Sequence, residues 1–536
     1  MQKLSRFRAC STVCMFLILL LMLVGFLRVA DTATDASLKA AAETQNTARI
    51  TVSRQRGTVF DTNMLPLTNT QSQNVTVVSP YADAQNALKG VLSAEELEAL
   101  REQLTQGKPV LVNTEEAVSG YGISNVTVAV NQSAGSMASH LLGYTDNTGH
   151  GVCGVQKAFD AVLYSGSTVD VCFVQDSRGR MVEKFGTEIK FKSGAELSGV
   201  KLTIDADIQA AVEGIAHDLK RGAIVISEVG SGKIRALVSR PNYDAANVAA
   251  YLSREDSPLL NRAFCAYNVG SVFKPCVAAA AMESGVVTNR LFECTGSFTV
   301  DQKNFVCHKK NGHGMVDLYA ALTYSCNTYF YSLALQTGAD AICDMASVLG
   351  FGQRCYFADS LFTDKGNVPA ASEHSSQRSL ANLAIGQGDL MLTPVSMLTL
   401  YEAIADGGVY HSPSLVEDYV SNGKPLGVLE EPLPTRAMSA ETAEKIGAAL
   451  ENVVENGTGL AAKPKLCTAA GKTATAQTGW IENGRFVEHS WFCGYFPADN
   501  PRYVAVIISE DTNGGGTPCS PLFARVADAV FKLKLS

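Results

Sequence analysis

Residues 268–282 read NVGSVFKPCVAAAAM, a stretch that joins a serine and a lysine to the start of an apolar helix. Pro275 is tolerated only in or near a first helical turn, so we expect a helix to begin close to Ser271. A serine and a lysine three residues apart then lie on the same helix face. Burial among apolar neighbours would remove the proton of Lys274 and make it a base that activates the Ser271 hydroxyl.

The Ser-x-x-Lys pattern is a weak signal by itself, because an N-cap serine beside a solvated lysine has the same spacing. Ser421 and Lys424 repeat the pattern inside an expected turn. The interpretation of Ser271 as a nucleophile therefore depends on what the rest of the chain supplies.

Two more motifs follow in the chain. Residues 325–327, SCN, lie at an expected bend between two apolar helical segments, where a hydroxyl can relay a proton and a carboxamide can hold an amide. Residues 471–476, GKTATA, predict an edge strand whose lysine and threonine can hold a carboxylate. Each motif is weak alone, since residues 72–74 repeat Ser-x-Asn and GKTATA also fits an ordinary strand. Their order within one domain favours a shared site.

The segments around these motifs predict an α+β fold. Residues 222–239, GAIVISEVGSGKIRALVS, predict a hairpin with a Gly-Ser-Gly turn. Residues 490–496 and 502–510 predict two more strands, followed by a helix from Pro521 to Leu535. Because Ala-rich helical segments lie between the strands at the two ends, we expect one antiparallel sheet covered by helices.

The N-terminus predicts a membrane anchor. Basic residues precede a charge-free stretch from Ala9 to Leu27 that is long enough to span a bilayer as a helix. The positive-inside rule places the N-terminus in the cytoplasm and the chain after about Arg28 outside, as in a single-pass protein of the cell membrane. A cleaved signal peptide is the alternative, because Ala30 and Ala33 are small enough to suit a peptidase.

Three parts are predicted along the chain. Residues 1–30 form the cytoplasmic tip and transmembrane anchor, residues 31–195 a mixed α/β pedestal without visible chemistry, and residues 196–536 the catalytic domain. The boundary is placed where residues 201–209, KLTIDADIQ, change from a strand pattern to a helix pattern.

Composition excludes some classes of function. The 536 residues, of which 46% are hydrophobic and 18% charged, describe folded material. The net charge of −8 comes without basic runs interleaved with aromatic residues, so nucleic acid is not expected as a partner. Of the 14 cysteines, Cys294 and Cys307 are the best local candidates for a disulfide, because they flank a polar loop in an exported domain. The chain lacks C-x-x-C and H-E-x-x-H motifs, so neither a zinc site nor another cofactor is predicted.

The three motifs, in this order, are the set found in penicillin-binding proteins and β-lactamases. The resemblance extends to class B penicillin-binding proteins over most of the chain after the anchor. In the first folded part, residues 56–61 (RGTVFD) and 151–160 (GVCGVQKAFD) resemble motifs of the non-catalytic domain. The blocks similar to the transpeptidase domain are residues 202–209, 261–274, 312–327, 384–397 and 471–477. The resemblance implies a serine β-lactamase-like transpeptidase fold whose substrate is the peptide stem of peptidoglycan.

The resemblance also implies a role for each motif residue. Ser271 would attack the D-Ala-D-Ala carbonyl and Lys274 would accept its proton. Ser325 would pass that proton to the leaving D-alanine. The backbone N–H groups of Ser271 and Thr475 would form the oxyanion hole.

Binding of the stem follows from the same resemblance. Asn327 would hold the amide of the stem, and Lys472 with Thr473 would bind its terminal carboxylate. An amine from a neighbouring stem would then resolve the acyl-enzyme into a crosslink. β-Lactams would acylate the same serine.

The sequence departs from the family pattern at three positions. Ala474 stands where the third motif of the family has glycine, which adds a methyl group to a strand that approaches the substrate closely. Val269 replaces a proline and Gln156 replaces a glutamate, both away from the proposed chemistry.

Several functions stay open at this point. A D,D-carboxypeptidase would use the same residues with water as the acceptor, and a catalytically idle scaffold is made conceivable by Ala474. A β-lactamase is disfavoured, because the deacylating Glu-x-x-Leu-Asn pattern is absent between Asn327 and Lys472. The partners that the resemblance implies are the membrane, a lipid-linked-glycan polymerase and other wall-synthesis proteins.

Overall fold

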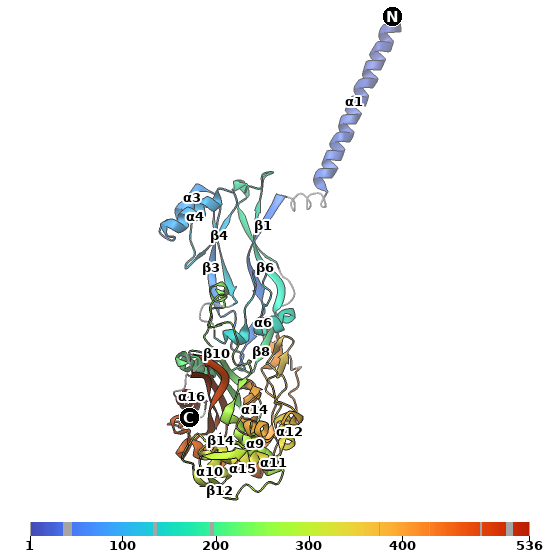
Figure 1. Ribbon diagram of the computed structural model, residues 1–536. Helices are drawn as coiled ribbons and strands as arrows, with labels where there is room; N and C mark the ends of the chain where they lie inside the picture. Colours follow the sequence, from blue (N-terminus) through green and yellow to red (C-terminus); the bar gives the residue numbers. More distant parts are fainter. Residues whose placement is uncertain are drawn as a thin grey trace. The chain divides into compact units, whose positions relative to one another are not determined.

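A computed structural model describes most of the chain (Figure 1). The described residues are 2–35, 46–131, 137–192, 198–374, 376–427, 429–482, 485–510 and 518–534. They divide into two compact units, the first formed by residues 1–55, 72–129 and 166–195, the second by residues 56–71, 130–165 and 196–536. The domain boundary predicted after residue 195 lies outside the described residues.

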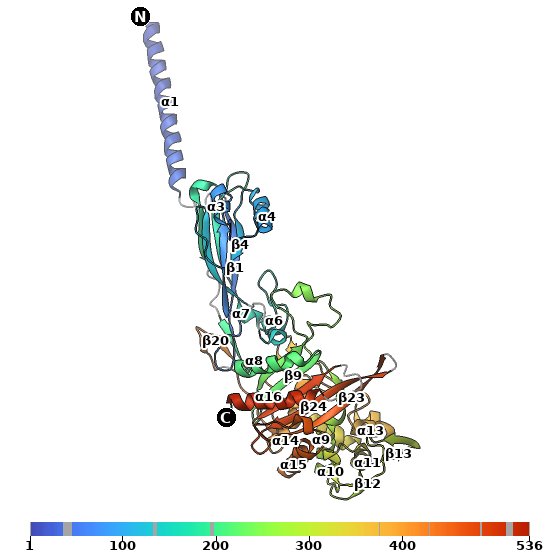
Figure 2. The same cartoon turned by 90° about the vertical axis from the view of Figure 1, so that its left-hand side faces the viewer.

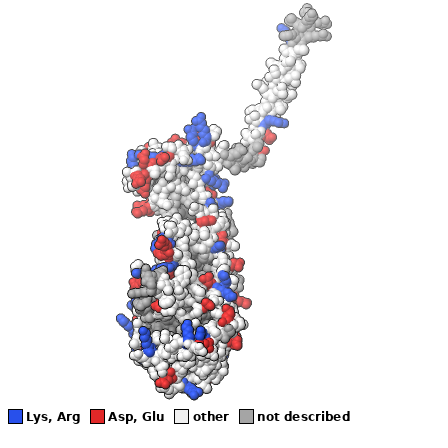
Figure 3. Space-filling model, viewed as in Figure 1, with Lys and Arg blue, Asp and Glu red and all other residues white. Residues whose placement is uncertain are grey.

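Helix α1 (Gln2–Thr34) is the N-terminal element of the first unit. Within Arg8–Thr34, an 18-residue window has a mean hydropathy of 2.7, and none of that window is buried. Its described apolar side chains are exposed on every side, and charged groups gather only near the ends of the helix (Figure 3). Among the described residues this is the one helix long and apolar enough to cross a membrane.

Two three-stranded sheets form the rest of the first unit. One has the order β1 (Thr47–Arg56), β6 (Tyr164–Val174), β7 (Thr187–Lys192), and the other the order β4 (Val110–Thr114), β3 (Gln71–Val78), β5 (Ile123–Val130). Helices α3 (Ala82–Ala87) and α4 (Ala94–Leu104) accompany them, and α4 begins with a capping box between Ser93 and Glu96. The unit is therefore mixed α/β, and it carries none of the three sequence motifs of the proposed site.

The second unit is built on a five-stranded antiparallel sheet. Its order is β10 (Ile234–Arg240), β9 (Gly222–Glu228), β25 (Tyr503–Ser509), β24 (Arg485–Phe496), β23 (Ala470–Glu482). The predicted hairpin is observed as β9 and β10, and the terminal strands as β24 and β25. All residues of β25 are buried, which requires cover on both faces of the sheet.

Helices supply that cover (Figure 2). On one face lie α8 (Ala206–Ile215) and α16 (Cys519–Lys534), whose apolar side chains form a core with alternate residues of the strands. On the other face lie α9 (Lys274–Glu283), α14 (Pro394–Ala405) and α15 (Ala440–Asn456). The α+β fold with an antiparallel sheet covered by helices is thereby confirmed. Leu535, the predicted end of α16, lies outside the described residues.

Helix α9 is the central helix of this unit. Every residue from Lys274 to Ala281 is buried, which explains why its sequence is apolar on all sides. Pro275 occupies its first turn, where the missing backbone N–H costs little. A 3₁₀ turn, Gly270–Phe273, precedes the helix and is held by a hydrogen bond from the Tyr401 hydroxyl to the carbonyl of Val272 (2.9 Å).

A small insert, residues 292–316, follows α9. Strand β12 (Phe292–Cys294) pairs with β15 (Gly314–Val316), and between them β13 (Ser297–Val300) pairs with β14 (Lys303–Val306). Helix α10 (Leu318–Thr323) then leads through residues 324–326 into α11 (Asn327–Thr337). Helix α10 thus separates the insert from the turn that carries the Ser-x-Asn motif.

A four-stranded sheet completes the unit. Its order is β2 (Val59–Phe60), β8 (Ser198–Leu202), β20 (Val416–Ser421), β21 (Lys424–Pro425). Close to it, the buried Arg56 donates hydrogen bonds to Gln156 Oε1 (2.9 Å) and to Asp160 Oδ1 (2.7 Å). Gln156 therefore supplies the acceptor for Arg56 at the position where the family has glutamate.

Candidate active site

Ser271 lies in the 3₁₀ turn that leads into α9, with a partly exposed side chain. The turn depends on two glycines. Gly270 has a φ of +63°, and its N–H donates to the carbonyl of Gly386 (2.9 Å). A Cβ on Gly386 would stand 2.1 Å from the carbonyl oxygen of Gly270, so neither position accepts a side chain without rearrangement. The close packing of these two loops fixes the backbone that carries Ser271.

Lys274 is fully buried one turn further along. Its Nζ donates to the carbonyl oxygen of Ser325 (2.8 Å), to Ser325 Oγ (3.1 Å) and to Asn327 Oδ1 (2.7 Å). Burial lowers the pKa of Lys274 to about 7, so the neutral amine is accessible near neutral pH. The first and second motifs therefore meet at this ammonium group.

Ser325 has an unusual backbone for a serine, with a φ of +55° in the left-handed region. It lies between α10 and α11 and is largely buried. Such conformations cost free energy and cluster at functional sites, where the surrounding structure holds them in place. The strained turn directs both oxygen atoms of Ser325 toward Lys274.

The third motif lies on β23, the edge strand of the five-stranded sheet. Lys472 is fully buried, and its Nζ lies 3.3 Å from the carbonyl oxygen of Thr473. Burial, and next the charge of Lys274, lower the pKa of Lys472. The Thr473 hydroxyl donates to Thr458 Oγ1 (3.1 Å). Side chains alternate along a strand, so Lys472 shares its face of β23 with Ala474, and Thr473 shares the opposite face with Thr475.

One cavity of about 270 Å³ brings the motifs together. The residues that line it are Ser271, His308, Ser325, Asn327, Thr458, Thr473, Ala474 and Thr475. Lys274 and Lys472 do not line it, because both are buried beneath its wall. The cavity presents the Ser271 hydroxyl, a second serine hydroxyl, a carboxamide and a strand edge to a ligand.

Two residues that line the cavity were not predicted from the sequence. His308 lies in the loop after β14 and Thr458 in the turn after α15, and neither belongs to a recognisable pattern. By contrast, the other Ser-x-x-Lys, Ser421 to Lys424, lies in the turn between β20 and β21 and does not reach the cavity. The second Ser-x-Asn, residues 72–74, lies on β3 of the first unit.

The candidate disulfide has a different environment from the one expected. Cys294 and Cys307 are both free cysteines, and the sulfur of each lies beside Nδ1 of His313. Cys326, the middle residue of the Ser-x-Asn motif, is close to the same group. The disulfide stays a prediction, to be weighed against another use of these thiols.

Comparison with known proteins finds relatives over most of the chain. Stage V sporulation protein D of Bacillus subtilis is 26% identical over 88% of this chain and 77% of the relative. The peptidoglycan D,D-transpeptidase MrdA of Haemophilus influenzae is 28% identical over 73% of this chain and 64% of the relative. The D,D-transpeptidase domain of a peptidoglycan glycosyltransferase from Eggerthella lenta is 25% identical and covers 90% of this chain and 100% of that domain, with a TM-score of 0.64.

The family can be assigned from a match of the second unit. The family model of the penicillin binding protein transpeptidase domain matches residues 222–528, which include all three motifs and every residue that lines the cavity. Because this match covers more than half of the chain, the protein belongs to the penicillin-binding protein transpeptidase family, as the resemblance to class B members predicted.

Proposed function

We propose that this protein is a peptidoglycan D,D-transpeptidase that crosslinks stem peptides through an acyl-enzyme on Ser271. The observation that carries the proposal is the meeting of three motifs from separate elements at one cavity, with the buried Lys274 bonded to both Ser325 and Asn327. The transpeptidase names of the relatives support the same reaction.

Acylation begins with the neutral amine of Lys274, which accepts the proton of the Ser271 hydroxyl as its oxygen attacks the carbonyl of the penultimate D-alanine. The negative charge that develops on the carbonyl oxygen is stabilised by the backbone N–H groups of Ser271 and Thr475. Ser325 accepts a hydrogen bond from Lys274 and relays the proton to the nitrogen of the departing D-alanine. The C–N bond breaks and an ester on Ser271 remains.

Binding of the donor stem uses the remaining groups. The Asn327 carboxamide holds a backbone amide of the stem, while Thr473 donates a hydrogen bond to the terminal carboxylate. Lys472 contributes its positive charge from its buried position on β23, and a bound carboxylate would favour the charged form of this lysine. The edge of β23 offers backbone groups to the extended stem.

Deacylation by an amine of a second stem forms the crosslink. Water in place of the amine would make the protein a D,D-carboxypeptidase with the same acyl-enzyme. β-Lactams acylate Ser271 because their strained amide presents the same carbonyl to the nucleophile.

The setting of the reaction is the outer side of the cell membrane. Helix α1 supports a single-pass anchor, and the basic residues before it support a cytoplasmic N-terminus. We place the bulk of the chain outside, in the three parts predicted from the sequence. A lipid-linked-glycan polymerase and other wall-synthesis proteins are its proposed partners, in contact with the anchor and the first folded part.

Covalent labelling with a fluorescent penicillin tests the proposal. The full-length protein in detergent is compared with Ser271→Ala and with the matched control Ser421→Ala, which alters the other Ser-x-x-Lys. We expect labelling of wild type and the control, and none of Ser271→Ala. Absence of labelling in folded wild type would contradict the proposal and favour an idle scaffold in which Ala474 closes the site.

A second assay separates the two acceptors. The protein is incubated with a stem peptide that ends in D-Ala-D-Ala, with and without an acceptor stem that carries a free amine, and the products are identified by mass spectrometry. A crosslinked dimer supports transpeptidation. Release of D-alanine without a dimer would instead identify a carboxypeptidase.

A further inference from the structure

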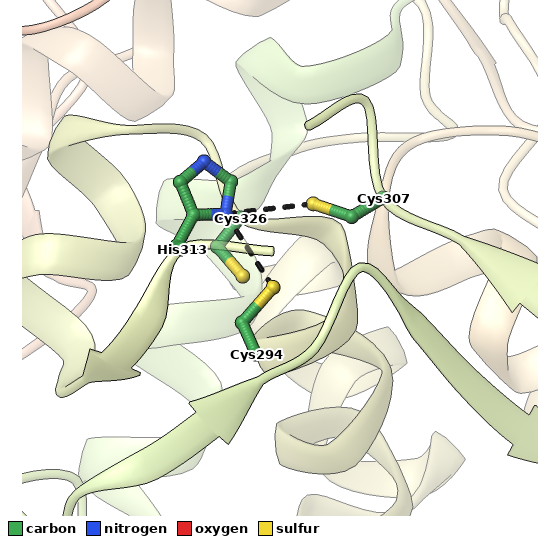
Figure 4. Close-up of side chains that lie close together, drawn as sticks. All are labelled: Cys294, Cys307, His313 and Cys326. Atoms are coloured by element: carbon green, nitrogen blue, oxygen red, sulfur yellow. Dashed lines mark hydrogen bonds between the residues drawn. The ribbon is translucent and has the colours of Figure 1, made fainter. Parts of the chain in front are cut away.

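Four side chains from separate parts of the sequence converge beside the proposed active site. We call Cys294, Cys307, His313 and Cys326 the Cys3His cluster. Their ligand atoms all lie within 4.8 Å of one another, the three cysteines are buried, and the histidine is partly buried. Figure 4 shows the sulfur atoms and the imidazole turned toward a common centre.

The spacing of these atoms fits a tetrahedral metal ion. Nδ1 of His313 lies 3.5 Å from the sulfur of Cys294 and 3.6 Å from that of Cys307. Zinc binds thiolates at about 2.3 Å and imidazole nitrogen at about 2.0–2.1 Å, so a tetrahedral site has a sulfur–nitrogen edge of about 3.6 Å. The two sulfur–nitrogen distances in the cluster match that edge.

We infer that the Cys3His cluster binds one Zn²⁺ ion as a structural site. Three thiolates and one imidazole are a ligand set that zinc takes in closed, four-coordinate structural sites. The set leaves no coordination position for water, so the ion has no direct part in the acyl transfer. Soft thiolate ligands exclude Mg²⁺ and Ca²⁺, which prefer oxygen.

The surroundings of the sulfur atoms support this inference. Cys307 receives hydrogen bonds from the backbone N–H groups of Lys309 and Asn327. Cys326 receives one from the N–H of Tyr329, and its sulfur lies 3.3 Å from the Thr328 hydroxyl. Such groups around the ligands stabilise thiolates and fix their orientation.

Two glycines allow the loops of the insert to close around the cluster. A Cβ on Gly312 would stand 2.0 Å from the carbonyl oxygen of Cys294, and one on Gly296 would stand 2.0 Å from that of Lys310. Both glycines have a positive φ. The local backbone is therefore built for the close approach that places these ligands together.

The position of the cluster gives the ion a second role. Cys294, Cys307 and His313 belong to the insert, whereas Cys326 stands between Ser325 and Asn327. A zinc ion would bond the insert to the turn that holds both proposed catalytic-site residues. This positioning role rests on the proposed function, whereas the metal site itself does not.

A disulfide between Cys294 and Cys307 is the rival use of the same thiols. It would remove two of the four ligands and leave His313 and Cys326 without a partner of matching chemistry. Zinc binding would keep all three thiols reduced in an exported domain. Metal content and thiol state therefore decide between the two.

Metal analysis of the purified protein tests the inference. The full-length chain is purified without chelator, and the number of zinc ions per chain is measured by inductively coupled plasma mass spectrometry. We expect about one zinc per chain in wild type and in the control Cys343→Ser, whose partly buried thiol in α12 (Ala339–Val348) lies outside the cluster. In Cys294→Ser and Cys326→Ser we expect zinc affinity to fall by about 100-fold or more, because changes to groups that merely support a ligand already cost about 10–100-fold.

Cobalt substitution keeps the test valid if a variant fails to fold. Wild-type protein loaded with Co²⁺ should show thiolate charge-transfer bands and the intense visible bands of a tetrahedral site, and Zn²⁺ should abolish them. Reduced protein that takes up no zinc would overturn the inference, as would zinc retained equally by both ligand variants. A Cys294–Cys307 disulfide in the native protein, found by peptide mapping, would overturn it too. None of these readouts uses penicillin labelling, so failure of the zinc site and failure of the proposed function are distinguishable.

Discussion

Lys274 is a lysine without solvent contact whose three hydrogen bonds all end on residues 325–327. Its ammonium group also lies 5.4 Å from the ring of Phe330. Burial weakens the charged form more than these acceptors stabilise it, which is why the pKa falls to about 7. A lysine that holds the Ser-x-Asn turn when charged can therefore accept a proton from Ser271 when neutral.

The pH dependence of acylation follows from this pKa. The base must be neutral, so the rate of acylation of Ser271 should rise with pH through about 7 and level off above it. One unit below the pKa only about a tenth of the lysine is neutral, so we expect the rate to be about tenfold lower there. The measurement is the rate of fluorescent-penicillin labelling between pH 5.5 and 9.

Two other titratable groups act on the pKa of Lys274 in this experiment. Negative charge on Cys326 or Cys307 favours protonation of Lys274 and so raises its pKa. Circular dichroism at each pH controls for unfolding. A labelling rate that stays constant between pH 6 and 8 would show that Lys274 is not the base.

Ala474 places a methyl group in the wall of the cavity where the family has glycine. Ala474→Gly should speed acylation by β-lactams by about tenfold, since one carbon atom in a binding pocket is worth about 1–3 kcal/mol. The same change should lower the free energy of unfolding by about 0.5–1 kcal/mol, because glycine weakens a strand. Labelling rates and urea unfolding measure the two effects.

The matched control is Ala470→Gly, on the same strand but outside the cavity. It should lose similar stability without faster acylation. Equal labelling rates for wild type and Ala474→Gly would show that the methyl group does not restrict the site.

At the scale of elements, the insert packs against α11 through aromatic pairs such as Phe305 with Tyr331, and an ion in the Cys3His cluster would add bonds from the insert to the turn before α11. Removal of zinc should free the turn that carries Ser325 and Asn327. We expect acylation of Ser271 to slow by about tenfold or more, because a displacement of about 1 Å at a reacting group can cost about 100-fold. The metal-free protein is prepared by chelation and dialysis, and labelling is measured before and after one equivalent of Zn²⁺ is returned.

Recovery of the rate on return of zinc separates positioning from irreversible damage. Cys343→Ser, treated in the same way, should behave as wild type. Metal-free protein that keeps the full labelling rate would show that the cluster, even if it binds zinc, does not position the Ser-x-Asn turn.

The elements predicted best are those whose sequence pattern lies within a few consecutive residues. The hairpin of β9 and β10 follows from alternating apolar runs around a Gly-Ser-Gly turn, and α9 follows from Pro275 and the alanines after it. The three motifs were found because each occupies only a few consecutive residues. Their meeting at one cavity was expected only through the family resemblance.

Other parts of the site carry no local signal. The ligands of the Cys3His cluster are separated by 12, 5 and 12 residues. The paired strands of the insert bring the first three together, and Cys326 meets them from the turn after α10. His308 and Thr458 lie in exposed loops, where the pattern of neighbours says nothing about a cavity. The left-handed backbone conformation of Ser325 could not be predicted from the sequence either, because serine rarely adopts it.

At the scale of the molecule, the chain combines a long apolar helix with folded units rich in ordinary polar surface. Charged groups of both signs are interspersed on the face of the folded units in Figure 3. The net charge of −8 also opposes attraction to an anionic surface, so we propose α1 as the membrane anchor. An enzyme tethered in this way would act on substrate that stays near the membrane.

Deletion of residues 2–45 tests that assignment. The chain from Asn46 onward should be soluble without detergent and should still be labelled at Ser271, because no motif residue precedes Gly270. The full-length protein should stay in the membrane fraction after a wash at high pH and high salt, since burial of about 20 apolar residues in the bilayer does not depend on charge. The intact mass of the protein decides between an anchor and a signal peptide. A mass that includes the stretch from Ala9 to Leu27 supports the anchor. A mature chain that begins near Ala33 and is released by the wash would identify a cleaved leader.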